Sequence, residues 1–334
     1  MMPSRLEAER ASTPTTIDIE VVVNAVELAC RAPSLHNSQP WRWVIGKTTI
    51  ELHADRSRVI RSTDNSGREA LIACGAALDH FRVAMAAAGW DTSVETFPDP
   101  DRPEHLASVR VCAPAPVTPS ARERADAILT RRTDRLPFRA PDDSLDVVLS
   151  NRPEGTFVDT LQAATHAELA EASRLTESLR SHDDRYHGEL QWWTTPFRLS
   201  EGIPPSALVS ESERRRVGVN RSFRPSGHLD RRSGTALDEA DVVVLSTPAD
   251  TREDAFISGQ ALSRVLLDLT AAGLATCTMT HLTEVEAGRD AIRRLTGRDA
   301  VPQALIRVGK VPTIENTPAP TPRRAVREVL EIRR

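Results

Sequence analysis

Two stretches of this chain, "GAALDHFRVAMAAAGW" at residues 75–90 and "GQALSRVLLDLTAAGL" at residues 259–274, repeat one pattern. Each begins with a glycine, carries apolar residues at helical spacing, and reaches a second glycine fourteen positions later, where a left-handed residue ends a helix. Downstream, "LASVRVCAPAP" at 106–116 matches "PQALIRVGKVP" at 302–312, and both are typical of a short strand. Similar composition alone would explain one matching helix, but helix, glycine and strand match in order. The pattern therefore favours duplication, with two halves packed about a pseudo-two-fold axis.

The segments around the first repeat predict further regular structure. A helix is expected over residues 17–29, and it must end before Pro33, which excludes the α conformation from the residue preceding it. "WRWVIGKTTIELHA" at 41–54 alternates apolar and polar residues about a central turn and predicts a β-hairpin. Residues 67–89 predict a helix that is apolar on most sides, which places it in the core.

A proline-rich hinge, "APAPVTPSA" at 113–121, separates the two expected halves. We predict a first half over residues 17–120 and a second over residues 121–334, after a disordered tail at 1–16. Residues 190–234 have no counterpart in the first half, and they predict a lid-like insertion. Its aromatic cluster suits either lid packing or substrate contact, and the candidate residues are Trp192, Trp193 and Phe197.

Composition limits the function classes. The 334 residues are 40% hydrophobic and 27% charged, which is typical of a soluble globular protein, and the net charge of −4 argues against general nucleic-acid binding. The first residues lack an apolar leader segment, and no run resembles a membrane span. Four scattered cysteines without metal-ligand or CxxC spacing suggest reduced thiols and a cytoplasmic setting.

A polar turn, "APSLHNSQPWRW" at residues 32–43, lies directly after the first expected helix. Five hydrogen-bonding side chains lie between two prolines, and two tryptophans follow. Trp41 and Trp43 are better explained as core anchors than as ligand contacts. His36 suits a structural hydrogen bond as well as proton donation. The stretch predicts a turn of fixed shape that holds a ligand.

Arginines beside hydroxyl groups give the second chemical signal. "RRTDR" at 131–135 places three guanidinium groups and one threonine within five residues, and guanidinium forks bind phosphate in bidentate fashion. Read alone, this run is also compatible with a solvated helix end. A further pair, Arg323 and Arg324, follows "TPAPTP" near the C-terminus, whereas the arginines at 214–216 are most simply a solvated face.

The usual catalytic signatures are absent. The sequence has no GxGxxG, no GxxxxGK[ST], no HExxH and no GxSxG motif. The nine histidines show no i, i+4 pairing with carboxylates that would suggest a metal site, so none is predicted. The phosphate-binding arginines and the turn instead suggest a composite site for a phosphorylated heterocycle.

These motifs together resemble the FMN-dependent nitroreductase superfamily. "APSLHNSQPWRWVI" resembles its PS-x-x-N-x-QPW turn, "RRTDRLPF" its RRS-x-R opening and "TPRRAVREVL" its C-terminal basic end. "GQALSRVLLDLTAAGLAT" with "PQALIRVGKVP" resembles its central helix and following strand. The resemblance covers roughly residues 17–330, and the fused arrangement with a central insertion looks like the Acg-like branch.

The resemblance implies an α+β fold in which each half is an antiparallel-rich sheet with packed helices. Superfamily members are homodimers with FMN at the subunit interface. Here the first half has the turn without the arginines, and the second has the arginines without the turn. We therefore expect one chain to imitate a dimer and to keep one complete FMN site, as a monomer or a homodimer.

The resemblance also implies roles for individual residues. Residues bordering the flavin ring would be Pro33, Ser34, Leu35 and Asn37. The phosphate and ribityl chain would contact Arg131, Arg132, Thr133 and Arg135, with Arg323 or Arg324. A loop beside the flavin edge would contain Thr276, Cys277, Thr278 and Met279, and its sequence "TCTMT" departs from the family's usual proline- or acid-containing loop.

Three functions remain open on the sequence. NADPH or NADH would reduce the flavin, which then reduces a nitroaromatic or quinone-type small molecule, with no separate catalytic residue required. Alternatively, the insertion closes over the flavin and the protein stores it with little or no turnover. Reductive dehalogenation or flavin fragmentation is a third possibility from the superfamily, although no residue singles it out. No nucleic-acid or membrane partner is expected.

Overall fold

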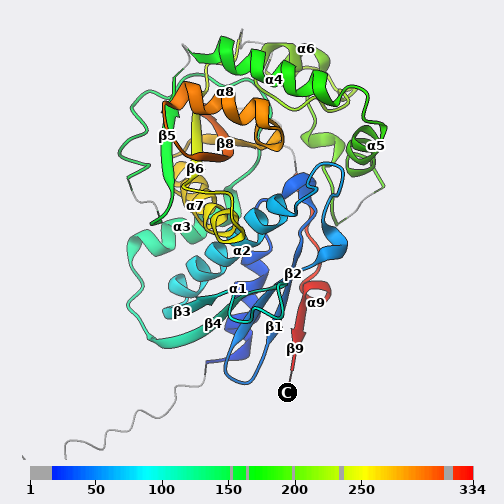
Figure 1. Cartoon of the computed structure of the whole chain (residues 1–334). Coiled ribbons are helices and arrows are strands. Elements are labelled where there is room, and N and C mark those ends of the chain that lie inside the picture. The colour runs from blue at the N-terminus through cyan, green and yellow to red at the C-terminus, as the bar shows by residue number, and fades with distance from the viewer. Residues whose placement is uncertain are drawn as a thin grey trace, which may run out of the picture.

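The computed structural model describes residues 17–150, 153–162, 165–197, 200–232, 237–311 and 319–333. The tail predicted over residues 1–16 lies outside the described residues. Two sheets with packed helices make an α+β protein, as expected (Figure 1).

The first sheet has five strands. Their order is β3 (Trp90–Thr96), β4 (His105–Pro114), β2 (Ile50–Ala54), β1 (Trp41–Ile45) and β9 (Leu330–Ile332). The predicted hairpin is confirmed, because β1 and β2 pair antiparallel with Ile45 opposite Ile50. β4 corresponds to the strand expected near residues 106–112, whereas β3 was not predicted. Only the β1–β9 pair is parallel.

The second sheet has four antiparallel strands. Their order is β5 (Phe157–Leu161), β6 (Asp241–Thr247), β8 (Val301–Gly309) and β7 (Ala275–Met279). Helices α4 (His166–Arg180) and α8 (Glu286–Thr296) pack together on the side of this sheet that faces away from the first half (Figure 1).

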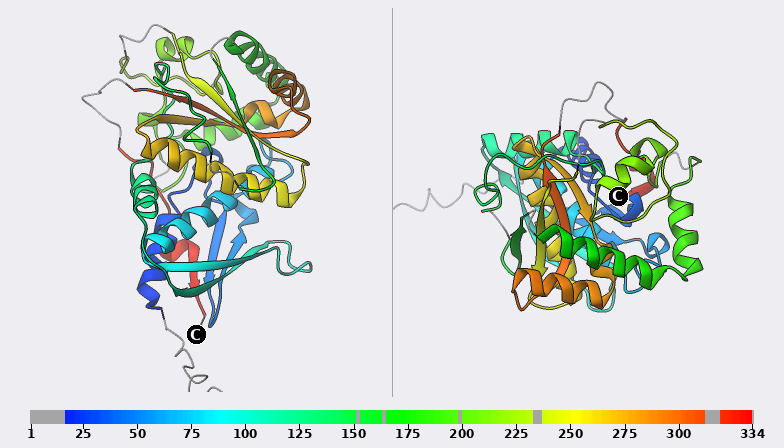
Figure 2. Two further views of the ribbon diagram at one scale, coloured as in Figure 1. Left: turned by 90° about the vertical axis from the view of Figure 1, so that its left-hand side faces the viewer. Right: turned by 90° about the horizontal axis from the view of Figure 1, so that it is seen from above.

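Two helices of equal length fill the space between the sheets. α2 (Arg68–Ala87) and α7 (Arg252–Ala271) each have 20 residues and pack against each other along the middle of the molecule (Figure 2). Gly89 and Gly273 follow them with φ of 83° and 76°, as the repeat predicts. Of the described helices, α2 alone is long and apolar enough to cross a membrane, but 78% of its apolar window is buried in the protein.

Two further helices pack on this central pair. α1 (Ile19–Ala29) begins at the N-cap Asp18, whose carboxylate accepts from the Glu20 amide, and it packs on α2. α3 (Pro119–Thr130) packs on both α2 and α7.

Trp41 and Trp43 are fully buried in the first half, which confirms their interpretation as core anchors. The four cysteines are free thiols, and only Cys112 is exposed.

The predicted boundary of the second half differs from the structure at the C-terminus. Strand β9 belongs by sequence to residues 121–334, yet it pairs with β1 of the first sheet, and the amide of Arg333 donates to the Ile45 carbonyl at 2.9 Å. α9 (Val326–Val329) precedes it. The chain therefore returns to its first half at its end, because edge strand β1 offers unpaired backbone groups.

The insertion begins within a helix. α5 (Asp184–Trp193) lies at its start, and the short helices η4 (Pro205–Ala207) and α6 (Glu211–Arg216) follow later in the insertion. α6 begins with a capping box, since the Ser210 hydroxyl accepts from the Glu213 amide and the Glu213 carboxylate accepts from the Ser210 amide.

Candidate functional site

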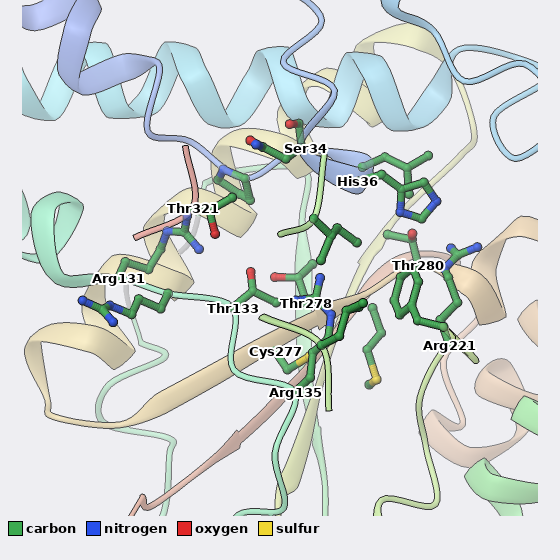
Figure 3. Close-up of a pocket in the computed structure, with 18 of the residues that line it drawn as sticks. Ser34, His36, Arg131, Thr133, Arg135, Arg221, Cys277, Thr278, Thr280 and Thr321 are labelled. Atoms are coloured by element: carbon green, nitrogen blue, oxygen red, sulfur yellow. The ribbon is translucent and has the colours of Figure 1, made fainter. Parts of the chain in front are cut away.

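A pocket lies where the turn, the arginine run, the insertion and strand β7 meet. Figure 3 shows Arg131 and Thr321 toward one end of it, with His36, Arg221 and Thr280 toward the other. The sequence-predicted residues that line it are Pro33, Ser34, Leu35, Asn37, Arg131, Arg132, Thr133, Arg135, Cys277, Thr278, Met279 and Arg323. Segments almost 300 residues apart in the chain thus form one site.

The turn has a strained backbone. The 3₁₀ turn η1 (Leu35–Asn37) carries positive φ values of 49° at His36 and 58° at Asn37, and Gln39 follows with 51°. Non-glycine residues in this region cost of order 1 kcal/mol or more each, so the surroundings must hold them. The Ser34 hydroxyl accepts from the Gln39 amide at 3.0 Å and closes the turn. The backbone therefore has the fixed shape that the sequence predicts.

The side chain of Asn37 ties the turn to its neighbours. Its amide nitrogen donates to the carbonyls of Gly202 at 3.1 Å and Pro322 at 2.9 Å. Gln39 does the same, because its amide nitrogen donates to the Ser200 carbonyl at 2.8 Å and its oxygen accepts from the Arg324 amide at 2.9 Å. Both amides thus fasten the insertion and the C-terminal segment onto the turn.

One end of the pocket carries unneutralised positive charge. Arg131 and Arg323 both donate to the Arg31 carbonyl, at 3.2 and 3.1 Å. Burial, followed by the charge of Arg31, lowers the pKa of Arg131 to about 10. Burial, followed by the charges of Arg131 and Arg31, lowers the pKa of Arg323 to about 9. Within the described residues no carboxylate pairs with either guanidinium, so this end is suited to an anion.

The other end is amphipathic. Phe223 of the insertion lies edge-on to His36, with ring centroids 5.6 Å apart, and the Arg135 guanidinium stands 5.4 Å from the same phenyl centroid. Burial, with the charges of Arg221 and Arg135, holds the pKa of His36 well below its usual value. Burial also disfavours the charge of Arg221, but the Glu284 carboxylate raises its pKa overall. His36 is therefore neutral beside a firmly charged Arg221.

Several buried polar atoms that line the pocket have no hydrogen-bond partner in the described structure. Among the described pocket residues, four have a buried side-chain nitrogen or oxygen with no hydrogen bond, namely His36 Nε2, Arg131 Nε, Thr278 Oγ1 and His281 Nδ1. Native proteins rarely leave such groups unsatisfied, because the desolvation cost of each is about 1–3 kcal/mol. A polar ligand extending along the pocket would satisfy them.

An acidic residue also lines this pocket. Glu69, in the first turn of α2, is buried and accepts from the Arg68 guanidinium at 2.6 Å. Burial raises the pKa of Glu69 to about 7, although the charge of Arg68 opposes the shift and the nearby carboxylates of Glu284 and Asp64 add to it. This group can hold a proton near neutral pH.

The predicted flavin-edge loop is a strand. Residues 275–279 form β7, whose pairing with β8 fixes their side chains, so the interpretation as a loop was wrong. Thr276 does not line the pocket. Instead its carbonyl accepts from the Asp134 amide at 2.9 Å, which holds the extended segment after α3 beside β7. Arg131 itself is the extended C-cap of α3, not part of a solvated helix end.

The structure separates several predicted residues from the pocket. Trp192, Trp193 and Phe197 do not line it, and the Phe197 side chain is 88% exposed. Phe223 takes the place expected for an insertion aromatic. Arg324 also lies outside the lining, where it donates to the carbonyls of Gln39 and Glu328.

Sequence reasoning missed several lining residues. Arg31 directly precedes the turn, so adjacency could have suggested it. Thr321 begins the C-terminal "TPRRAVREVL" motif, so its position beside Arg323 could have suggested it. Glu69 and Arg221 carry no local signal, because only the tertiary fold brings them to the pocket.

Comparison with known proteins identifies the family. "Putative NAD(P)H nitroreductase acg" of Mycobacterium tuberculosis (strain ATCC 25618 / H37Rv) is 52% identical over 324 residues, which cover 96% of this chain and 98% of the relative. The chain belongs to the acg nitroreductase family. A second protein of that strain, "Putative NAD(P)H nitroreductase Rv3131", is 34% identical over 94% of this acg-family chain and 92% of its own length. No protein-family model matches.

Solved structures resemble this acg-family protein more distantly. The FMN-dependent nitroreductase NfnB from Mycobacterium smegmatis, in complex with NADPH, is 17% identical, with a TM-score of 0.34 over 57% of this chain and 88% of its own. A nitroreductase with bound FMN from Bacteroides fragilis is 14% identical, with a TM-score of 0.36 over 60% of this chain and 96% of its own.

Proposed function

We propose that this acg-family protein binds one FMN per chain and uses NADPH or NADH to reduce nitroaromatic or quinone-type small molecules. The observation that carries the proposal is the pocket itself, which has an unneutralised arginine end and unpartnered polar atoms along its length. A long cofactor with a phosphate at one end suits both features. When bound, FMN supplies the hydride-transfer chemistry.

The chain's own residues would hold this cofactor in a defined direction. Arg131 and Arg323, with Arg31 beside them, would bind the phosphate, because guanidinium donors make strong charge-assisted hydrogen bonds. Hydroxyls of Thr133 and Thr278 would bind the ribityl chain. Residues expected at the ring are Pro33, Ser34, Leu35, His36, Cys277 and Met279.

At the ring end, neutral His36 would donate or accept one hydrogen bond through Nε2, which has no protein partner. Arg221 would place a positive charge nearby, favourable for a reduced, anionic ring. Glu69 would hold a proton close to neutral pH. In this proposal the protein supplies orientation and charge, and the electron acceptor would reach the cofactor through the same pocket.

A second candidate, storage of an occluded flavin with little turnover, is favoured by the contacts of the insertion. Asn37 and Gln39 bind backbone carbonyls of the insertion, and Arg58 forms an ion pair with Glu201 of the insertion. These contacts hold the insertion against the turn. Ile203, Leu208 and Phe223 add an apolar cover to the pocket.

Anaerobic spectroscopy separates the two candidates. We expect the purified protein, reconstituted with FMN, to lose its flavin absorption on addition of NADPH or NADH and to regain it with a nitroaromatic or quinone acceptor. Bleaching by dithionite but by neither nicotinamide would favour storage and contradict the reductase proposal. The free thiols favour a cytoplasmic setting for this function. The proposal takes the active unit to be a monomer or a homodimer, without a nucleic-acid or membrane partner.

A further inference from the structure

A cluster of metal-ligating side chains lies on the first sheet, away from the pocket. Glu51 and His53 are on β2, and His105 begins the neighbouring strand β4 (Figure 1). A register shift after Leu52 places His53 directly opposite His105. One ligand atom from each of the three side chains lies within 4.8 Å of the other two. None of the three lines the pocket.

Both imidazoles are buried, and that of His105 is incompletely satisfied. His53 and His105 are 6% and 3% exposed, and their rings stack with centroids 4.6 Å apart. His53 Nε2 hydrogen-bonds the Glu51 carboxylate at 2.9 Å, and His105 Nε2 hydrogen-bonds the Ser108 hydroxyl at 3.0 Å. His105 Nδ1 has no partner in the described structure. A buried nitrogen lone pair or N–H without a partner is costly, so it calls for a ligand.

We propose that Glu51, His53 and His105 bind a divalent transition-metal ion of the zinc class. Imidazole nitrogen and carboxylate oxygen are the ligands that such ions take, and three protein ligands leave a fourth position for water. The Ser108 hydroxyl on Nε2 of His105 orients that ring and leaves Nδ1 for the metal, the usual arrangement for a metal-bound histidine.

The surrounding charges permit a cation. The positive side chains around the cluster have carboxylate partners of their own: Arg42 and Arg333 both pair with Glu331, at 3.0 and 2.7 Å, and Arg102 pairs with Asp99 at 2.6 Å. The Glu51 carboxylate therefore remains available to His53 and to a metal ion. Metal binding breaks the hydrogen bond between them and releases any proton held there. The stacked rings must also turn toward each other, which the broad χ2 torsion of histidine permits.

The sequence did not reveal this site because its ligands have strand spacing. Glu51 and His53 are two residues apart, so alternation puts them on one face, and His105 reaches them only through strand pairing. A search for helical i, i+4 pairs does not detect such a set.

Metal binding by the full-length protein tests the proposal. The chain is treated with chelator, dialysed against Zn²⁺ and analysed for bound metal, and Co²⁺ serves as a spectroscopic probe of coordination. We expect one Zn²⁺ per chain in the parent protein and in His182→Gln, a control at an exposed histidine. Glu51→Gln and His105→Gln should each weaken binding by at least about tenfold.

Circular dichroism and denaturant titration show whether each variant folds. If His105→Gln does not fold, Glu51→Gln carries the test, since Glu51 is partly exposed. Absence of stoichiometric Zn²⁺ in the parent, or equal binding by the parent and a folded ligand variant, would overturn the proposal. Neither result depends on whether the pocket binds flavin.

Discussion

Gly75 of α2 and Gly259 of α7 each lie against the backbone of the other's helix, at equivalent positions. A methyl group on Gly75 would lie 2.0 Å from the carbonyl oxygen of Phe256, and one on Gly259 would lie 2.0 Å from that of Ile72. Each carbonyl belongs to the residue three positions before the partner glycine. Such reciprocity is expected of a pseudo-two-fold axis through the crossing. The repeat in the sequence thus corresponds to a close backbone contact between the halves.

Substitution at this crossing should destabilise the whole protein. Gly75→Ala or Gly259→Ala places a methyl group against a backbone carbonyl that cannot rotate away, and we expect a loss of about 2 kcal/mol or more in the free energy of unfolding. Gly188→Ala, in α5 with open space around it, is the matched control and should be neutral or stabilising. Denaturant titration measures all three. Parental stability of both crossing variants would mean that the helices do not approach as described.

The arginine end should determine FMN affinity. Arg131→Ala or Arg323→Ala removes charged donors at the proposed phosphate site, and each such hydrogen bond contributes about 1.5–3 kcal/mol, or roughly ten- to a hundredfold in Kd. Arg131→Lys should retain part of the affinity. Arg215→Ala is the control, because Arg215 is exposed and pairs with Glu211. Fluorescence titration with FMN gives the four dissociation constants. If Arg215→Ala changed the dissociation constant of FMN as much as the pocket variants do, Arg131 and Arg323 would not be the phosphate site.

Glu69 should make stability depend on pH. Its folded-state pKa, about 7, lies above the ordinary value of 4.5, so the native state binds more protons between these values. The contribution of Glu69 to the free energy of unfolding is therefore greatest below about pH 4.5. This contribution is lost as the pH rises toward and through 7. At 1.36 kcal/mol per pKa unit the effect is at most about 3 kcal/mol.

Glu69→Gln tests this directly. The variant should lose the decline in unfolding free energy between pH 5 and pH 8 that the parent shows. Denaturant titrations at several pH values compare the two proteins. The same decline in both would assign the pH dependence to other groups.

The cover over the ring end should control access to the pocket. Phe223→Ala removes the phenyl ring that contacts His36 and Arg135, so flavin reduction by NADPH should become faster if the insertion limits entry. Phe197→Ala, at an exposed phenylalanine of the same insertion, should leave the rate unchanged. Stopped-flow absorbance measures both. A slower Phe223→Ala would instead give this ring a role in binding the nicotinamide.

Local sequence predicted the parts of the fold that local forces determine. The hairpin at 41–54, the helices ending near Gly89 and Gly273, and the turn after α1 follow from alternation, helix termination and proline. Strand β3 was missed because its pattern of alternating half-buried and exposed residues is weakly apolar. β9 was missed because its partner is far away in the sequence.

The candidate site, like the fold, was predictable only where a local motif marks it. Its arginine run and turn could be predicted because each is a compact motif. Phe223 and Glu69 could not, since helix packing and the path of the insertion alone bring them to the pocket. Trp192 was attractive by residue type, yet α5 leaves it 59% exposed and outside the pocket.

The most direct test of the central claim is the FMN stoichiometry of the full-length chain. The claim is that the turn of the first half and the arginines of the second complete one site. The protein, stripped of flavin, is titrated with FMN while its visible spectrum and fluorescence are recorded. We predict saturation at one FMN per chain, with loss of binding in a double Arg131→Ala, Arg323→Ala variant. No binding, or saturation at two FMN per chain, would contradict the account.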